Sequence, residues 1–307
     1  MNRYFLIPVS LFFFIIVLLV LYFQYLDDEW KYFYKAKEKI IPKYCEDNTE
    51  DFENMIIKLD SDILENRNFD DQIDNSKNEI HLIYLVPCDV VSRDLDINGK
   101  IKKIVSNINT WFYQKSNNQK LKFDHDNLKL DITFMRINKT LSWFNNFNSI
   151  QDNKNDNASK IEKIIMANSK RFKNFETKKF IIFFEGWEKR KGLNPTCGRA
   201  RFDGQVAIYY TNTNIKNKGS CVNIMERSTV VLGSEEQTVL HELLHLMGYP
   251  RSCGKNIDPK NLLHVNDSKD DILFKFSGGK YLDYNNDDYY NHKIKDCSDL
   301  KDSKYLF

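Results

Sequence analysis

Apolar residues along this chain follow two spacings, which predict strands in some segments and helices in others. Continuous apolar runs of strand length, rich in β-branched and aromatic residues, occupy residues 79–87, 178–186 and 204–212. Such runs are typical of strands buried on both faces of a sheet. Residues 121–125 and 128–137 instead alternate apolar and polar side chains, which predicts further strands.

Three other segments carry apolar residues at helical spacing. They recur every three or four positions in residues 98–115 and again in residues 159–172. The third helix begins at Ser234, which reads as a capping box with Gln237, and it ends near Gly248. The order of these elements predicts an α+β fold, in which helices back a mixed sheet and the third helix lies under that sheet.

The most apolar segment of the chain is residues 5–26, whose 22 residues would reach about 33 Å as a helix. Arg3 precedes it and acidic residues follow it, which favours a cytoplasmic N-terminus and an extracytoplasmic remainder. No small-residue cleavage site closes the run, so we expect residues 1–26 to be an uncleaved signal anchor, a single transmembrane helix. A cleaved signal peptide is the alternative, and it would make the protein secreted.

Composition divides the rest of the chain into two parts. Residues 46–79 hold 12 acidic and 3 basic side chains with few large apolar ones, so we expect residues 27–79 to be an acidic linker or stalk. The remaining residues 80–307 have the size of one globular domain. The formal charge of +2 gives no reason to expect a nucleic-acid partner.

All six cysteines follow the apolar segment: Cys45, Cys88, Cys197, Cys221, Cys253 and Cys297. An even number on the oxidising side of a membrane predicts up to three disulfides, whose pairing the sequence does not fix. Free buried thiols are the alternative.

Candidate chemistry is concentrated in the third helix, in the stretch HELLH. Residues four apart lie on one face of a helix, so His241 and His245 can converge on one ion while Glu242 lies beside them. This H-E-x-x-H pattern is typical of catalytic zinc, which takes neutral imidazole ligands and keeps one position open for water. Glu242 would take the proton of that water and pass it to a leaving amine. Chance occurrence on a buried helix is the alternative, but the chain has only 6 histidines.

The chain resembles the zincin metallopeptidases, nearest to their metzincin branch, and more closely a group of secreted bacterial proteins similar to zinc peptidases. The resemblance covers about residues 80–292 and rests on the segments IYLVPCDVVSRDLDINGKI, INTWFYQKSNNQKLKFD, LDITFMRI, CGRARFDG, HELLHLMGYPRSC, HVNDSKDDILF and LDYNNDDYY. It implies a zincin-like fold and a zinc-dependent metallopeptidase that cleaves protein or peptide substrates by Glu-assisted attack of zinc-bound water.

The third zinc ligand departs from the patterns of these families. A metzincin has a histidine six residues after the second one, but this chain has Arg251 there, whose guanidinium has no lone pair to offer. A gluzincin takes a glutamate from a later helix, but no glutamate follows Glu242. His264, His292 or an aspartate must therefore serve. The resemblance favours His264 as its matching histidine, with Asp267 as the runner-up.

Two further features follow the zinc helix. The segment DDILF stands where metzincins have a methionine turn beneath the metal, and the matching residue here is Leu273. Tyr281, Tyr289 and Tyr290 are candidates to stabilise a developing oxyanion, although packing is the commoner use of a tyrosine.

The expected function is a membrane-anchored, extracytoplasmic zinc metallopeptidase. The alternatives are a non-catalytic, zinc-stabilised binding or adhesion module and a zinc amidase acting on cell-wall peptides. A purely structural zinc has no use for a base at Glu242, which argues against the module. The sequence does not separate the amidase from the peptidase.

Overall fold

The computed structural model describes residues 45–48, 51–57, 67–68, 77–126, 128–146, 156–188, 196–211, 232–275 and 279–307. The predicted signal anchor at residues 1–26 lies outside these ranges, as does Cys221. Within these ranges, no helix is long and apolar enough to cross a lipid bilayer.

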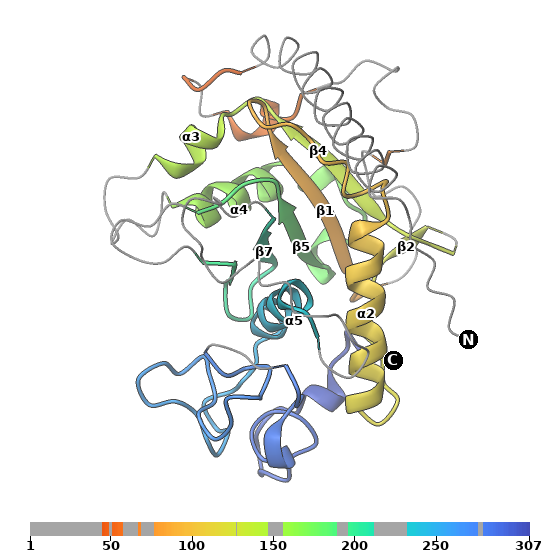
Figure 1. Cartoon of the computed structure of the whole chain (residues 1–307), viewed down its shortest axis with the longest axis vertical. Coiled ribbons are helices and arrows are strands. Elements are labelled where there is room, and N and C mark those ends of the chain that lie inside the picture. The colour runs from red at the N-terminus through yellow and green to blue at the C-terminus, as the bar shows by residue number, and fades with distance from the viewer. Residues whose placement is uncertain are drawn as a thin grey trace, which may run out of the picture.

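A five-stranded mixed sheet forms the centre of the fold (Figure 1). Its strand order is β4 (Ile132–Ile137), β1 (Ile80–Pro87), β5 (Lys179–Phe184), β7 (Val206–Tyr210) and β6 (Gly198–Ala200). The first four strands are parallel, and β6 pairs antiparallel with β7 at one edge. A separate two-stranded ribbon joins β2 (His125–Asp126) to β3 (Lys129–Leu130).

The three continuous apolar runs are strands β1, β5 and β7, as the sequence predicts, and every residue of these strands is buried. The alternating segment at residues 128–137 divides in two, because only β4 joins the central sheet while β3 belongs to the ribbon. Strand β6 has no signal in the sequence, since its three residues are too few to show a period.

Helices cover both faces of the sheet, and their bounds are α2 (Lys100–Lys115), α3 (Leu141–Asn145), α4 (Asn157–Ala167) and α5 (Ser234–Leu246). Leu82 and Tyr84 of β1 lie in one core with the apolar sides of α2 and α5. Ile83 and Leu85 lie in a second core with α3 and α4. Figure 1 shows these two helix pairs on opposite sides of the sheet. The predicted mixed sheet backed by helices is therefore confirmed.

The predicted helix boundaries are shifted by a few residues. α2 begins at Lys100 after the left-handed Gly99, and α4 begins after Asp156, whose carboxylate caps the Ser159 N–H at 2.8 Å. Short 3₁₀ turns make up the remaining helical segments: Phe52–Asn54, Ser169–Arg171, Phe175–Thr177, Tyr284–Asn286 and Leu300–Asp302.

Part of the segment expected to be a solvated linker is attached to the domain. Cys45 forms a disulfide with Cys88 at the end of β1, and Met55 is fully buried in the core that contains α4. The Ile57 N–H donates to the Arg136 carbonyl at 2.8 Å, alongside an antiparallel bridge to the last residue of β4. This contact covers the free edge of the sheet. The described residues 45–48 and 51–57, which lie inside the predicted linker, are thus attached to the domain. The linker assignment for residues 27–79 stays a prediction.

The chain after α5 has little regular secondary structure, and its loops are held together by a disulfide and by side-chain hydrogen bonds. A disulfide joins Cys253 to Cys297, and the buried Asp283 carboxylate accepts the backbone N–H groups of Tyr289 and Tyr290, each at 2.6 Å. Figure 1 shows this segment, in blue, on the far side of α5 from the sheet. Helix α5 is therefore enclosed between the sheet and the C-terminal loops.

Candidate metal centre

Helix α5 carries both histidines of the H-E-x-x-H stretch in regular helical geometry. Its N-cap is Gly233, so Ser234 is the first helical residue and the predicted capping box at Ser234 is wrong. The Gln237 amide instead donates to the Leu232 carbonyl at 2.7 Å. The helix ends at Leu246, and Gly248 follows with φ near +86°, a conformation that favours glycine.

Two backbone carbonyls orient the rings of His241 and His245. His241 Nδ1 lies 2.6 Å from the Ile272 carbonyl oxygen, and His245 Nδ1 lies 2.9 Å from the Tyr249 carbonyl oxygen. Because a carbonyl only accepts, each Nδ1 carries the ring proton and each Nε2 keeps its lone pair. The two Nε2 atoms are only 2.9 Å apart. Two lone pairs at that distance repel each other unless a cation lies beside both.

A proton is a poor candidate for that cation. Burial lowers the pKa of His241 to about 4, and burial together with His241 lowers the pKa of His245 well below its usual range. Both rings are therefore neutral at physiological pH. Neutral imidazoles whose Nδ1–H groups bind carbonyls and whose Nε2 atoms converge are what a zinc ion requires of its ligands.

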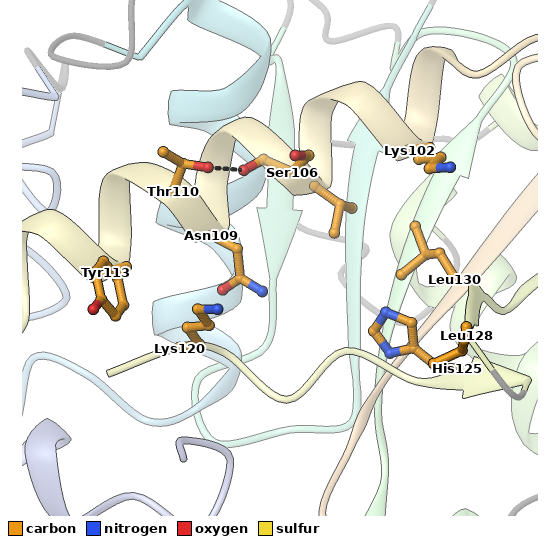
Figure 2. Close-up of a pocket in the computed structure, with 10 residues that line it drawn as sticks. Lys102, Ser106, Asn109, Thr110, Tyr113, Lys120, His125, Leu128 and Leu130 are labelled. Atoms are coloured by element: carbon orange, nitrogen blue, oxygen red, sulfur yellow. Dashed lines mark hydrogen bonds between the residues drawn. The ribbon is translucent and has the colours of Figure 1, made fainter. Parts of the chain in front are cut away.

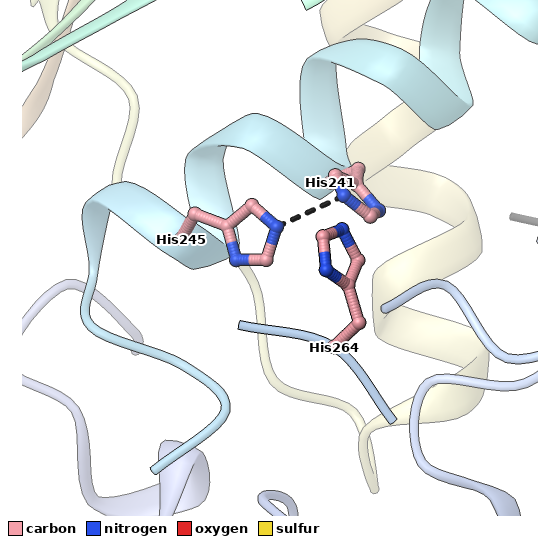
Figure 3. A group of neighbouring side chains, drawn as sticks. All are labelled: His241, His245 and His264. Atoms are coloured by element: carbon pink, nitrogen blue, oxygen red, sulfur yellow. Dashed lines mark hydrogen bonds between the residues drawn. The ribbon is translucent and has the colours of Figure 1, made fainter. Parts of the chain in front are cut away.

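His264 completes the group from the loop after α5. Its ring centroid lies 5.2 Å from that of His241 and 5.1 Å from that of His245 (Figure 3). Ligand nitrogens of all three histidines lie within 4.8 Å of one another, and His264 Nδ1 is buried without a hydrogen-bond partner among the described residues. Val265 anchors this loop in the core, whereas Leu263 is 37% exposed.

The alternative ligands lie elsewhere. The carboxylate of Asp267 is grouped with Asp287 and Asp288 instead of the histidines. The buried His292 accepts the Ile294 N–H on Nδ1 at 3.2 Å and so organises its own loop. Among the described residues, the imidazole group therefore consists of His241, His245 and His264.

Arg251 stabilises the end of α5. Its guanidinium carbon lies 5.6 Å from the ring centroids of both Phe202 and Tyr249, and its Nη1 is 3.4 Å from Asp203. It also packs so closely on Gly248 that a Cβ there would lie 2.8 Å from Nη2. The residue in the place of the metzincin histidine is thus used for packing.

Glu242 lies beside the edge strand. A Cβ added to Gly198 of β6 would lie 2.6 Å from Glu242 Cγ and 3.0 Å from its Oε1. It would also lie 2.8 Å from the methyl group of Thr238, one turn earlier on α5. The absence of a side chain at Gly198 therefore creates the space that the Glu242 side chain occupies. Spacing alone gave no sign of this contact.

The remaining candidate residues are Leu273 and three tyrosines, most of which are buried in the core. Leu273 is fully buried in the core that contains α5, and the carbonyl of the preceding residue faces His241. The hydroxyl of Tyr289 donates to the buried Asp271 at 2.8 Å, and that of Tyr290 donates to Gln119 at 3.0 Å. Tyr281 is 40% exposed and its ring meets Tyr284. Of the three tyrosines, Tyr281 alone has no described hydrogen bond from its hydroxyl.

A groove of about 470 Å³ lies between α2 and the β2–β3 ribbon, and none of His241, His245 and His264 lines it (Figure 2). Its lining residues include Lys102, Asn109, Tyr113 and His125, and the Nδ1 of His125 faces the Phe123 carbonyl at 2.7 Å. Among the described residues, no hydrogen bond joins the hydroxyls of Ser106 and Thr110 in this groove to His125, and the groove holds no group of metal ligands.

No known protein family matches this chain, and no curated protein matches it. Two solved structures of OgpA from Akkermansia muciniphila are similar. The wild-type protein is 13% identical with a TM-score of 0.38, and a catalytically inactive form bound to an O-glycopeptide substrate, glycodrosocin, is 12% identical with a TM-score of 0.37. Each match covers 62% of this chain and 52% of the other. The chain thus spans about half the length of OgpA, and so distant a likeness assigns no function.

Proposed function

We propose that this protein is a zinc metallopeptidase whose metal ligands are His241, His245 and His264. The observation that carries the proposal is the pair of Nε2 atoms 2.9 Å apart on rings whose Nδ1 atoms face carbonyl oxygens. Three neutral imidazoles make an open site that leaves room for water and substrate, as in catalytic zinc centres. A zinc ion bound there would polarise a peptide carbonyl and lower the pKa of a water molecule to about 7.

Glu242 supplies the proton transfers. It follows the first ligand directly on α5, and its side chain lies along the edge strand β6, next to Gly198. In the proposed reaction its carboxylate accepts a proton from the attacking water and then donates it to the leaving amine, which restores the carboxylate. Because Gly198 has no side chain, the Glu242 side chain can occupy this position.

Replacing Glu242 by Gln tests the reaction in the purified full-length protein. Hydrolysis of an unstructured protein substrate should fall by at least about 100-fold while zinc content stays unchanged, because only the base is removed. Glu235→Gln is the matched control, since Glu235 lies on the same helix and pairs with Lys100 at 2.5 Å. Surviving turnover in Glu242→Gln would refute the assigned base. A wild-type protein that binds zinc but hydrolyses nothing would instead be a zinc-stabilised binding module.

We further propose an extracytoplasmic domain held by a signal anchor at residues 1–26. Two disulfides, Cys45–Cys88 and Cys253–Cys297, and a third disulfide-bonded residue, Cys197, support an oxidising compartment. Extraction of membranes with alkaline carbonate should leave the protein in the pellet. Release of the intact domain into the supernatant would support a cleaved signal peptide.

A further inference from the structure

Three aspartates outside the histidine group share one small region of the C-terminal segment. One carboxylate oxygen from each of Asp267, Asp287 and Asp288 lies within 4.8 Å of the other two. They come from two separate stretches of chain, one after His264 and one after the 3₁₀ turn Tyr284–Asn286. Three like charges at this distance oppose each other's ionisation unless positive charge lies among them.

The donors around these aspartates are unevenly distributed. Lys255 Nζ contacts Asp287 at 2.7 Å, and the Asn256 amide donates to Asp287 at 3.0 Å and to Asp288 at 3.2 Å. Asp288 is fully buried, and the Asn256 backbone N–H also donates to it. Lys255 is 69% exposed, so water weakens its contribution.

No side-chain donor of this kind contacts the Asp267 carboxylate among the described residues. Each of its two carboxylate oxygens has less than 1 Å² of accessible surface and no hydrogen-bond partner among the described residues. The partial exposure of this residue therefore belongs to its other atoms. A carboxylate whose oxygens are shielded from water and receive no side-chain donor is costly unless a cation binds it. One of its oxygens lies within 4.8 Å of an oxygen of each of the other two aspartates, so all three can share that cation.

We propose that Asp267, Asp287 and Asp288 bind one calcium ion. Oxygen-only ligands select a hard cation, whereas zinc takes imidazole or thiolate. Calcium takes several carboxylate oxygens in a flexible geometry, which suits three aspartates on irregular loops. Magnesium is instead usually held by one or two carboxylates and keeps several of its water molecules. Water molecules would complete the coordination.

Such an ion would fasten the loop that supplies His264. Asp267 lies three residues after that histidine, while Asp287 and Asp288 belong to the segment closed by the Cys253–Cys297 disulfide. The calcium site is independent of the proposed zinc site, because no ligand is shared.

Calorimetric titration of the chelator-treated full-length protein with calcium chloride, without added zinc, tests the proposal. We expect one calcium per chain, with a dissociation constant below about 1 mM as in extracellular calcium modules. The melting temperature should rise with calcium, and magnesium should bind at least about 10-fold more weakly. Absence of calcium binding up to about 10 mM, or tighter binding of magnesium, would overturn the assignment.

Asp267→Asn is the informative variant. It should weaken calcium binding at least about 10-fold. In the presence of a chelator the variant should have a melting temperature no lower than that of wild type, because the substitution removes repulsion among the three carboxylates. Asp270→Asn is the matched control, since Asp270 lies on the same loop but pairs with Lys280 at 2.9 Å. Equal calcium affinity in Asp267→Asn and wild type would reject the site. A chelator-treated Asp267→Asn protein that melts well below wild type would show a structural role without an ion.

Discussion

The contact between Gly198 and Glu242 allows the position of the proposed catalytic base to be tested by mutation. In Gly198→Ala the new Cβ would lie 2.6 Å from Glu242 Cγ and 2.8 Å from the Thr238 methyl group. Carbon atoms in contact are separated by about 3.5–4.0 Å, so the side chain of Glu242 must move by about 1 Å. A displacement of that size in a reacting group costs roughly 100-fold in rate.

The same overlap also costs stability. Added methyl groups in packed sites typically destabilise a protein by about 1–3 kcal/mol. For a domain of this size each kcal/mol corresponds to about 2–4 °C in melting temperature. Zinc content should remain that of wild type, because none of the three histidines is among the nearest atoms to the added Cβ. We therefore expect loss of kcat with zinc retained and a moderately lowered melting temperature.

Gly186→Ala provides a matched control. Its added Cβ would lie 2.5 Å from Phe184 Cε1 and 2.6 Å from Leu141 Cδ1, an overlap of similar size in the core formed with α3 and α4. That core is on the opposite face of the sheet from α5. Peptide hydrolysis, zinc content by mass spectrometry and melting temperature would be measured for both variants. Equal kcat in Gly198→Ala and Gly186→Ala, with both melting lower than wild type, would refute the assigned place of Glu242.

Two further predictions concern stability. Cys45→Ala removes the disulfide between Cys45 and Cys88, which are 43 residues apart in the sequence. The free energy of unfolding, measured in urea, should fall by about 2–5 kcal/mol. A loss below 1 kcal/mol would mean that residues 45–57 are not an integral part of the domain. Burial opposes ionisation of Asp124, but hydrogen bonds from His81 and Lys178 outweigh it and lower its pKa to about 2. Because this pKa lies below the unfolded value, about 2 kcal/mol of stability is present above pH 4 and is lost between pH 4 and 2. In Asp124→Asn this acid loss should be smaller by that amount, and unfolding curves with the same pH dependence in both proteins would contradict it.

The sequence predicted the fold best where long segments have a clear period. The buried strands and the amphipathic helices are predictable because their apolar residues extend over five or more positions. The three-residue β6 carries no such pattern, although it is the strand that contacts Glu242. The packing of Met55 was missed because the acidic composition around it dominates the local average, and a single buried side chain is invisible to composition.

The candidate site was predictable in part for similar reasons. Helical spacing brings His241 and His245 together on one face, since local geometry fixes their positions. The place of His264 depends on how a long irregular loop folds, which no local pattern encodes, so only the resemblance singled it out. The rings of His241 and His245 are oriented by the backbone carbonyls of Ile272 and Tyr249. Every residue has such a carbonyl, so the sequence does not mark these two. The sequence makes Asp267 the alternative zinc ligand, and its grouping with two later aspartates depends on how the same loop folds.

Zinc binding by the full-length protein tests the central claim most directly. Metal content and affinity would be measured for wild type, His264→Ala and Arg251→Ala after equilibration with zinc. The account predicts one zinc per chain in wild type and in Arg251→Ala. Affinity in His264→Ala should fall by at least about 100-fold, because removing a ligand costs more than removing a partner that merely orients one. Wild-type protein that binds no zinc, or a His264→Ala variant that binds it as tightly as wild type, would contradict the proposed centre.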